Sequence, residues 1–178
     1  TGLLAYMPEQ PNRPPVAFDR AGTKRPNQIE GIQGRWTFAV SPTSGRLFLG
    51  GDVDIWRYDP ATDGEAKVFT GQGSSPVPGP GDTLVAYLYW QWQEGCGIRL
   101  YDVNPDEDRE LFSGPCLSVT DWSNDGQHLL LENAFDWLPD PLPKTQIWRY
   151  SFADDSLYSF VVRDGGTRDG ELSPERRW

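Results

Sequence analysis

The sequence has few of the residues from which catalytic and metal sites are built. Among its 178 residues there are two cysteines, one histidine and one methionine. One histidine without a second histidine excludes a zinc site made by this chain alone, and it leaves no ordered Ser–Asp–His set. No Gly-x-Ser-x-Gly segment, no Gly-rich loop ending in Lys-Ser/Thr and no kinase signature occurs. We therefore expect no enzyme activity, no cofactor and no metal in this chain.

Positive charge and long apolar runs are scarce as well. Sixteen Lys and Arg residues stand against 26 Asp and Glu, which gives a formal net charge of −10. Such a chain does not favour nucleic acid, because phosphate binding needs a clustered basic patch. No apolar run approaches the ~20 residues that span a bilayer, so we expect no membrane span in this chain. An initiating methionine is absent too, and we interpret the chain as part of a larger protein.

The chain does contain a short strand pattern that recurs. The pattern is Ile-x-x-Tyr, found at Ile55–Tyr58, Ile98–Tyr101 and Ile147–Tyr150, with a weaker copy at Val16–Asp19. A polar turn recurs in phase with it, at Ser41–Gly45, Pro78–Gly81, Ser123–Gly126 and Ser173–Arg176. Two markers with a shared period of roughly 40–50 residues, and four short strands per unit, predict a β-propeller.

The predicted fold is all-β, a propeller fragment of four-stranded antiparallel blades. We expect a partial first blade at 1–33, complete blades at 34–71, 72–114 and 115–164, and the first strand of a truncated next blade at 165–178. The least regular segment is Gly71–Gly81, rich in Gly, Ser and Pro, which we interpret as a crossover followed by a worn innermost strand. Propellers close with typically 4–8 blades, so this would be an arc whose open strand edges favour self-association.

The turns resemble those of a known repeat family. Ser41–Pro42 with Gly45–Arg46, Trp122–Gly126 and Ser173–Trp178 are similar to the Ser-Pro-Asp-Gly-Arg turn of TolB-like, or WD-repeat-like, propeller repeats. The opening Leu3–Met7 and Ala17–Gly22 resemble the start of propellers found behind some bacterial serine/threonine kinase domains. The resemblance implies a propeller fold over nearly the whole chain, and a binding or sensing role.

Strand alternation predicts which residues are buried. In the aromatic stretch from 87 to 93, Tyr87 and Tyr89 should point to one face of a blade, and Leu88, Trp90 and Trp92 to the other. Repeat equivalence also assigns one set of side chains to the core: Val85, Leu100, Leu129, Leu131 and Ile147. The acidic turns have no Asp-x-Asp-x-Asp-Gly loop with a distal Glu, so we interpret them as solvated turns.

The two cysteines can meet if two adjacent strands form a hairpin. Pairing Asp102 with Asp108 places Cys96 opposite Gly114 and close to Cys116. A disulfide between Cys96 and Cys116 is then geometrically possible, and it would suit an extracytoplasmic protein. Two unpaired thiols are the alternative.

One surface is a candidate binding site. Loops between the second and third strands share a face with the crossovers between blades, and two such loops are aromatic and acidic. The candidate residues are Trp90, Trp92, Glu94, Phe135, Asp136, Trp137 and Asp140. Exposed aromatics beside carboxylates can hold a sugar or a peptide segment. Packing between blades is the alternative role for these aromatics.

Two functions fit these observations. The first is a non-catalytic propeller that binds a protein, peptide or glycan on one face, as the extracytoplasmic part of a larger protein. The second is the gating propeller of a prolyl-oligopeptidase-type serine peptidase whose catalytic domain lies outside this chain. Neighbouring sequence with kinase motifs or with a Gly-x-Ser-x-Gly segment would distinguish them.

Overall fold

The computed structural model describes residues 3–6, 16–19, 21–23, 35–41, 43–51, 54–59, 62, 64–91, 95–104, 106–134, 146–162 and 170–172. Within these residues there are strands and one short 3-10 turn, η1 (Pro80–Asp82), but no α-helix. The strands are β1 (Leu3–Tyr6), β2 (Val16–Asp19), β3 (Arg35–Val40), β4 (Leu47–Gly51), β5 (Asp54–Asp59), β6 (Gly64–Thr70), β7 (Gly73–Pro78), β8 (Leu84–Gln91), β9 (Gly95–Asp102), β10 (Glu107–Gly114), β11 (Leu117–Trp122), β12 (His128–Asn133), β13 (Gln146–Ser151) and β14 (Ser156–Val162).

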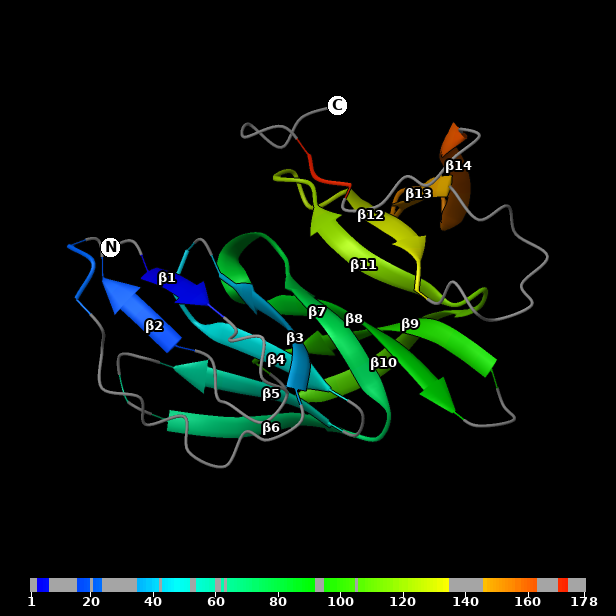
Figure 1. Ribbon diagram of the computed structural model, residues 1–178. Helices are drawn as coiled ribbons and strands as arrows, with labels where there is room; N and C mark the ends of the chain where they lie inside the picture. The colour runs from blue at the N-terminus through cyan, green and yellow to red at the C-terminus, as the bar shows by residue number, and fades with distance from the viewer. Residues whose placement is uncertain are drawn as a thin grey trace.

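The strands form consecutive antiparallel meanders of four, as predicted. β3–β6, β7–β10 and β11–β14 each pair in chain order, and β1–β2 form a separate hairpin (Figure 1). We call the three meanders blades A, B and C. One bridge between Gly51 and Gly73 joins the sheets of blades A and B. The inner strand β7 lies beside both other inner strands, β3 and β11. The chain is therefore a β-propeller fragment with three complete blades.

The inner strand of blade B is more regular than the sequence indicated. β7 spans Gly73–Pro78 and pairs with β8, with a register shift between Ser74 and Val77. Pro76 lies in that bulge, where its missing N–H costs no ladder bond. Proline and glycine therefore mark an irregular strand here, not the lack of one. Residues 170–172 have no strand structure, and the rest of the expected next blade lies outside the described residues.

A close backbone approach holds blades A and B together. A Cβ added to Gly50 on β4 would come within 2.9 Å of the Cα of Ser74 and of the Cδ of Pro76. Beside it, the Ser75 N–H of β7 donates to Thr37 Oγ1 of β3 at 2.8 Å, and that hydroxyl faces the Gly50 carbonyl. Glycine at position 50 thus permits β4 of blade A to approach the inner strand β7 of blade B closely.

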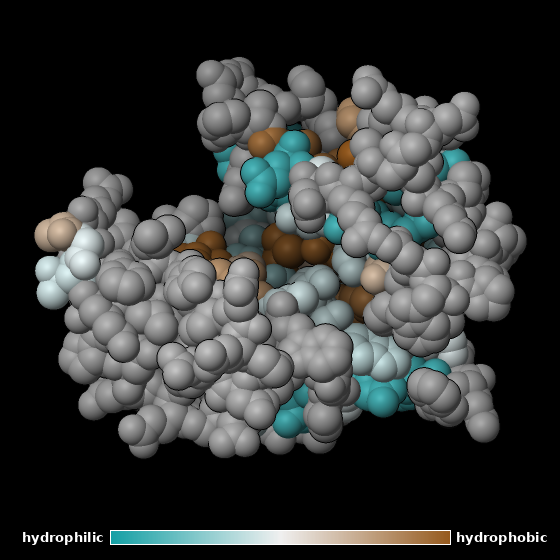
Figure 2. Space-filling view, viewed as in Figure 1, coloured by the Kyte–Doolittle hydropathy of each residue, from teal (hydrophilic) through white to brown (hydrophobic). Residues whose placement is uncertain are grey.

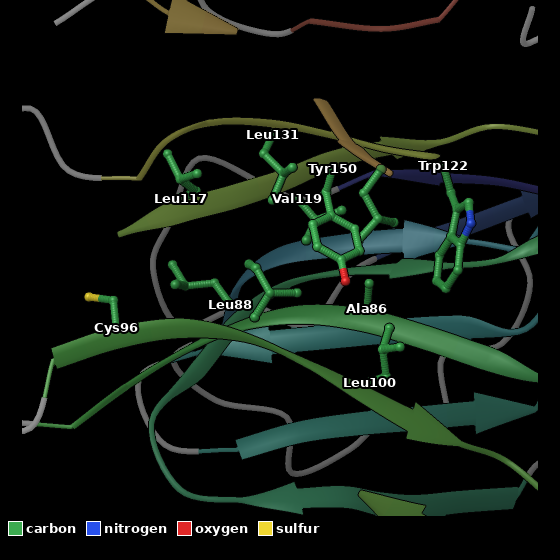
Figure 3. Packing of buried hydrophobic residues seen from close by; sticks show 11 residues of the cluster. Ala86, Leu88, Cys96, Leu100, Leu117, Val119, Trp122, Leu131 and Tyr150 are labelled. Carbon is green, nitrogen blue, oxygen red and sulfur yellow. The ribbon is translucent and has the colours of Figure 1, made fainter. Parts of the chain in front are cut away.

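Apolar side chains fill the space between adjacent blades. Between blades B and C, residues of β8 and β9 meet residues of β11, β12 and β13 (Figure 3). Between blades A and B, Tyr87 and Val85 pack on Phe48 and Ile55. The predicted alternation is confirmed, since Tyr87 faces blade A whereas Leu88 and Trp90 face blade C.

The predicted core residues are buried with one exception. Val85, Leu100, Leu129 and Leu131 are at most 1 % exposed. Ile147 is only half-buried, because it lies on the opposite face of blade C from Trp148 and contacts Gly170. Repeat equivalence identified its strand correctly but could not tell which neighbouring segment covers that face.

Candidate functional site

Of the predicted binding residues, Trp90 is described by the structure. It lies near the end of β8, half-buried, and packs against the core between blades B and C. The other candidates, Trp92, Glu94, Phe135, Asp136, Trp137 and Asp140, lie outside the described residues. The structure therefore describes one residue of the predicted surface, and the neighbours of Trp90 define the site around it.

A disulfide lies directly beside Trp90. Cys96 pairs with Trp90 across β8 and β9, and the structure joins Cys96 to Cys116, with the two Cα atoms 4.9 Å apart. The predicted pairing of Asp102 with Asp108 is wrong by one residue, because Asp102 faces Glu107. A bulge between Glu110 and Phe112 then restores the register, so that Gly114 faces Cys96. The bridge ties blade B to the start of blade C.

A pocket of about 330 Å³ opens at the same end of the blades. The residues that line it share one feature, since most come from the inner strands or the ends of the second strands. They are Thr37, Gly51, Ser74, Ser75, Leu88, Trp90, Ser118, Val119, Thr120, Glu132 and Ala134. Figure 2 shows apolar side chains at the bottom of a recess between the lobe that carries β11–β14 and the rest of the molecule.

Serine and threonine hydroxyls are the main polar groups of this pocket. Thr37 and Thr120 use theirs to bond the backbone carbonyls of Gly50 and Leu130. In the described part of the chain, the hydroxyls of Ser74, Ser75 and Ser118 make no hydrogen bond. These three half-buried hydroxyls can therefore bond a bound molecule or water.

Sequence reasoning missed the serines of the pocket. On β11, Ser118 and Thr120 alternate with the buried Leu117 and Val119, a period-2 signal of a strand with one polar face. Serine and threonine are unusual at the core-facing positions of an innermost strand. This pattern could have identified β11 as a wall of a pocket. The Ser74–Ser75 pair gave no such signal because it lies in a bulge.

Apolar groups and one carboxylate complete the lining. Leu88 and Val119 belong to the core between blades B and C and form the base of the pocket. Glu132 is the one charged side chain among the described lining residues, and it lies directly opposite Ser118 across β11 and β12. The pocket therefore offers hydroxyls, an indole, aliphatic groups and a negative charge.

The groups with perturbed pKa values lie away from this pocket. Burial and a 2.6 Å hydrogen bond to Asp108 raise the pKa of Tyr87, on the face of blade B that packs against blade A. Burial and the carboxylate of Asp106 raise the pKa of Tyr101 to about 12. Tyr87 bonds a carboxylate on β10 and Tyr101 one in the turn before β10, an arrangement that holds the hairpin rather than one that moves protons in a site.

The one Ser–Asp–His group near in sequence is a turn. Ser123 Oγ donates to Asp125 at 2.6 Å and accepts the backbone N–H of His128, so that the serine is engaged as a turn residue. No set of three or more metal-ligating side chains occurs in the part of the chain that the structure describes. Among the same residues, none forms a helix with the length and apolar character that crossing a bilayer requires.

Comparisons with known proteins identify the fold. No protein-family model and no curated protein matches the sequence. Among solved structures, TolB from Acinetobacter baumannii matches with a TM-score of 0.74 and 17 % identity, over 98 % of this chain and 45 % of that one. An auxiliary nutrient binding protein from Bacteroides thetaiotaomicron matches with a TM-score of 0.65 and 14 % identity, over 98 % and 42 %.

Enzymes occur among the similar structures as well. A prolyl endopeptidase matches with a TM-score of 0.61 and 13 % identity, over 88 % of this chain and 27 % of that chain. The chain thus spans less than half the length of each of these three proteins. Identities this low carry the fold and no activity. The chain has the fold of a TolB-like β-propeller.

Proposed function

We propose that this chain is a non-catalytic binding module of a larger extracytoplasmic protein. The observation that carries the proposal is the pocket beside Trp90, where the hydroxyls of Ser74, Ser75 and Ser118 make no hydrogen bond in the described part of the chain. Half-buried polar groups that make no internal bond are what a binding site needs and what a core avoids. The Cys96–Cys116 disulfide supports an oxidising compartment, where such bonds persist.

A gating propeller of a serine peptidase is the second candidate. It is supported by the likeness to a prolyl endopeptidase, a protein in which inter-domain dynamics has a role in catalysis and specificity. A hydrolase domain in the same polypeptide would support this second function. A kinase domain and a transmembrane helix there would instead support a sensor, the role that the resemblance of the first strands implies.

The binding proposal can be tested by filling the pocket. Ser118→Trp should place an indole inside it, and Ser113→Trp on the exposed outer strand β10 is the matched control. We expect saturation-transfer NMR with a mixture of small sugars and capped peptides to give signals with the wild type and S113W. These signals should disappear with S118W.

Thermal unfolding of each variant should be followed in parallel. If S118W does not fold, Ser74→Leu fills the pocket from β7 and repeats the test from the opposite wall. Signals that survive both variants, or no signal with the wild type, would overturn the proposed function.

A further inference from the structure

We propose that the pocket binds one end of a neutral oligosaccharide. In this inference, which rests on the proposed function, Ser74, Ser75 and Ser118 bond sugar hydroxyls and Trp90 contacts the C–H face of a ring. The chemistry of the lining residues disfavours anions, purely apolar ligands, small polar ligands and extended peptides.

The charge of the lining residues disfavours anionic ligands. Among the described residues that line the pocket there is no Lys, Arg or His, and there is one carboxylate, Glu132. A phosphate or carboxylate ligand would meet a like charge and no cation, while the chain as a whole carries −10. The site therefore selects against anions.

The hydrogen-bonding groups of the lining residues disfavour purely apolar ligands. A serine hydroxyl both donates and accepts, and so does each hydroxyl of a sugar, so the two sets match in any orientation. A purely apolar ligand would remove three serine hydroxyls from water without a partner, which is unfavourable. A ligand that carries many hydroxyls satisfies them.

The apolar part of the lining disfavours small polar ligands. Trp90, Leu88, Val119 and Ala134 provide surface that small polar ligands such as amides or urea would not cover. A pyranose ring has an apolar C–H face and a rim of hydroxyls, and an indole beside hydroxyls complements both. The volume, about 330 Å³, is at the lower end for ligand pockets and fits a short saccharide end rather than a folded partner.

The backbone of β7 favours a sugar over an extended peptide. Peptides bind sheets by adding a strand to a free edge, which requires regularly spaced backbone N–H groups. On β7 the N–H of Ser75 is already bonded to Thr37 Oγ1, and Pro76 has none. The β7 wall of the pocket therefore does not offer a regular ladder to a peptide, whereas its side-chain hydroxyls remain available.

The test is titration calorimetry with defined probes. The neutral probes are maltose, cellobiose, mannobiose and N,N′-diacetylchitobiose, the anionic probe is digalacturonate, and the peptide probe is acetyl-tetraalanine amide. We expect at least one neutral disaccharide to bind, and digalacturonate to bind at least about tenfold more weakly because of Glu132.

Variants then link that affinity to the proposed groups. S74A/S118A should weaken the binding of that disaccharide by about tenfold, the effect of losing two ordinary hydrogen bonds. Trp90→Ala should weaken it at least about fivefold, and Trp90→Phe less, since phenylalanine keeps the ring contact and the packing. The exposed Ser113→Ala is the control and should change nothing.

The possible failures are distinguishable. Binding of the peptide, lost in S118W, without binding of any disaccharide would overturn the saccharide inference and leave the proposed function standing. Equal affinity for digalacturonate would overturn the selection for neutral sugars. Absence of binding by all probes would overturn both proposals.

Discussion

A tyrosine–aspartate pair recurs at the hairpin between the third and fourth strands of blades B and C. Tyr101 donates to Asp106 at 2.5 Å, and Tyr150 donates to Asp155 in the same way. Both aspartates have φ near +50 to +60°, a conformation that Asp and Asn tolerate better than most residues. The sequence predicted solvated turns, and Asp106 and Asp155 are exposed. Each also accepts a hydrogen bond from the tyrosine five residues earlier, which the sequence analysis did not predict.

The first prediction concerns alkaline pH. Because the pKa of Tyr101 is raised to about 12 in the folded protein, the neutral hydroxyl is favoured by folding. The stability it provides is complete below the ordinary tyrosine pKa of about 10 and is lost as pH rises toward 12. Urea unfolding between pH 9 and 11.5 should show a smaller loss of stability for Tyr101→Phe than for the wild type.

Asp106→Asn provides the matched variant for this test. Asparagine accepts the same hydrogen bond and tolerates the positive φ, but it removes the negative charge that helps to raise the pKa of Tyr101. The loss of stability should then be smaller and should end at a lower pH than in the wild type, while it still begins near the ordinary tyrosine pKa of about 10. Identical pH profiles for all three proteins would show that Tyr101 does not titrate with folding.

The second prediction concerns a buried carboxylate that joins two turns. Asp82, in η1 of blade B, accepts hydrogen bonds from the Ser41 hydroxyl and, at 3.1 Å, from the Ser44 N–H in the turn between β3 and β4 of blade A. It is 6 % exposed, with φ +57°. Asp82→Asn keeps this backbone but presents an NH₂ group to one of the two donors. We expect it to reduce the free energy of unfolding by about 1–3 kcal/mol.

Chemical denaturation measures this cost against an exposed carboxylate. Glu107→Gln, on β10, is the control, because its side chain lies in solvent. It should change the free energy of unfolding by less than about 0.5 kcal/mol. Equal effects of D82N and E107Q would mean that the contact between the turns does not hold blades A and B together.

At the scale of elements, the third prediction concerns the disulfide. Cys96 and Cys116 are 20 residues apart, and closing a loop of that size in the unfolded chain stabilises a protein by about 3 kcal/mol. Cys96→Ser/Cys116→Ser should lower stability by about that amount. Trp90 pairs with Cys96, and Ser118 follows Cys116 by two residues, so ligand affinity should fall as well.

Dithiothreitol gives an independent measurement of the same bond. It should shift the melting temperature of the wild type toward that of the double variant and leave the variant unchanged. The prediction is contradicted if the melting temperature of the wild type does not respond to dithiothreitol and mass spectrometry finds both cysteines as free thiols before reduction.

Most of the blade architecture could be predicted from the sequence, and the reasons are local. Ile-x-x-Tyr strands and polar turns repeat because each blade packs the same way on its neighbour. β7 could be predicted only as a worn innermost strand, because Ser74, Ser75 and Pro76 break the alternation that identifies strands. The pocket could not be predicted because its walls come from three blades, whereas Trp90 was a candidate because it is aromatic and near a loop.

At the scale of the whole molecule, apolar cores lie between neighbouring blades. Leu131 of β12 is fully buried and lies in the core between blades B and C, together with Leu88 and Leu100 (Figure 3). In a repeat architecture each unit is stabilised by its neighbours, so damage at one interface spreads to both units that share it. The core between blades A and B is built from other residues, among them Phe48 and Val85.

The fourth prediction follows from this coupling. Leu131→Ala should cost about 2–5 kcal/mol, the range for a buried leucine that leaves a cavity. Hydrogen exchange should accelerate in β8 and β9 as much as in β12 and β13, although the substitution lies in blade C, while β4 and β5 of blade A should change less. Phe160→Ala, at an exposed position on the outer strand β14, is the control and should affect mainly its own hairpin. Faster exchange confined to blade C after L131A would mean that the blades are independent units, because only a shared core transmits the loss of one leucine across the interface.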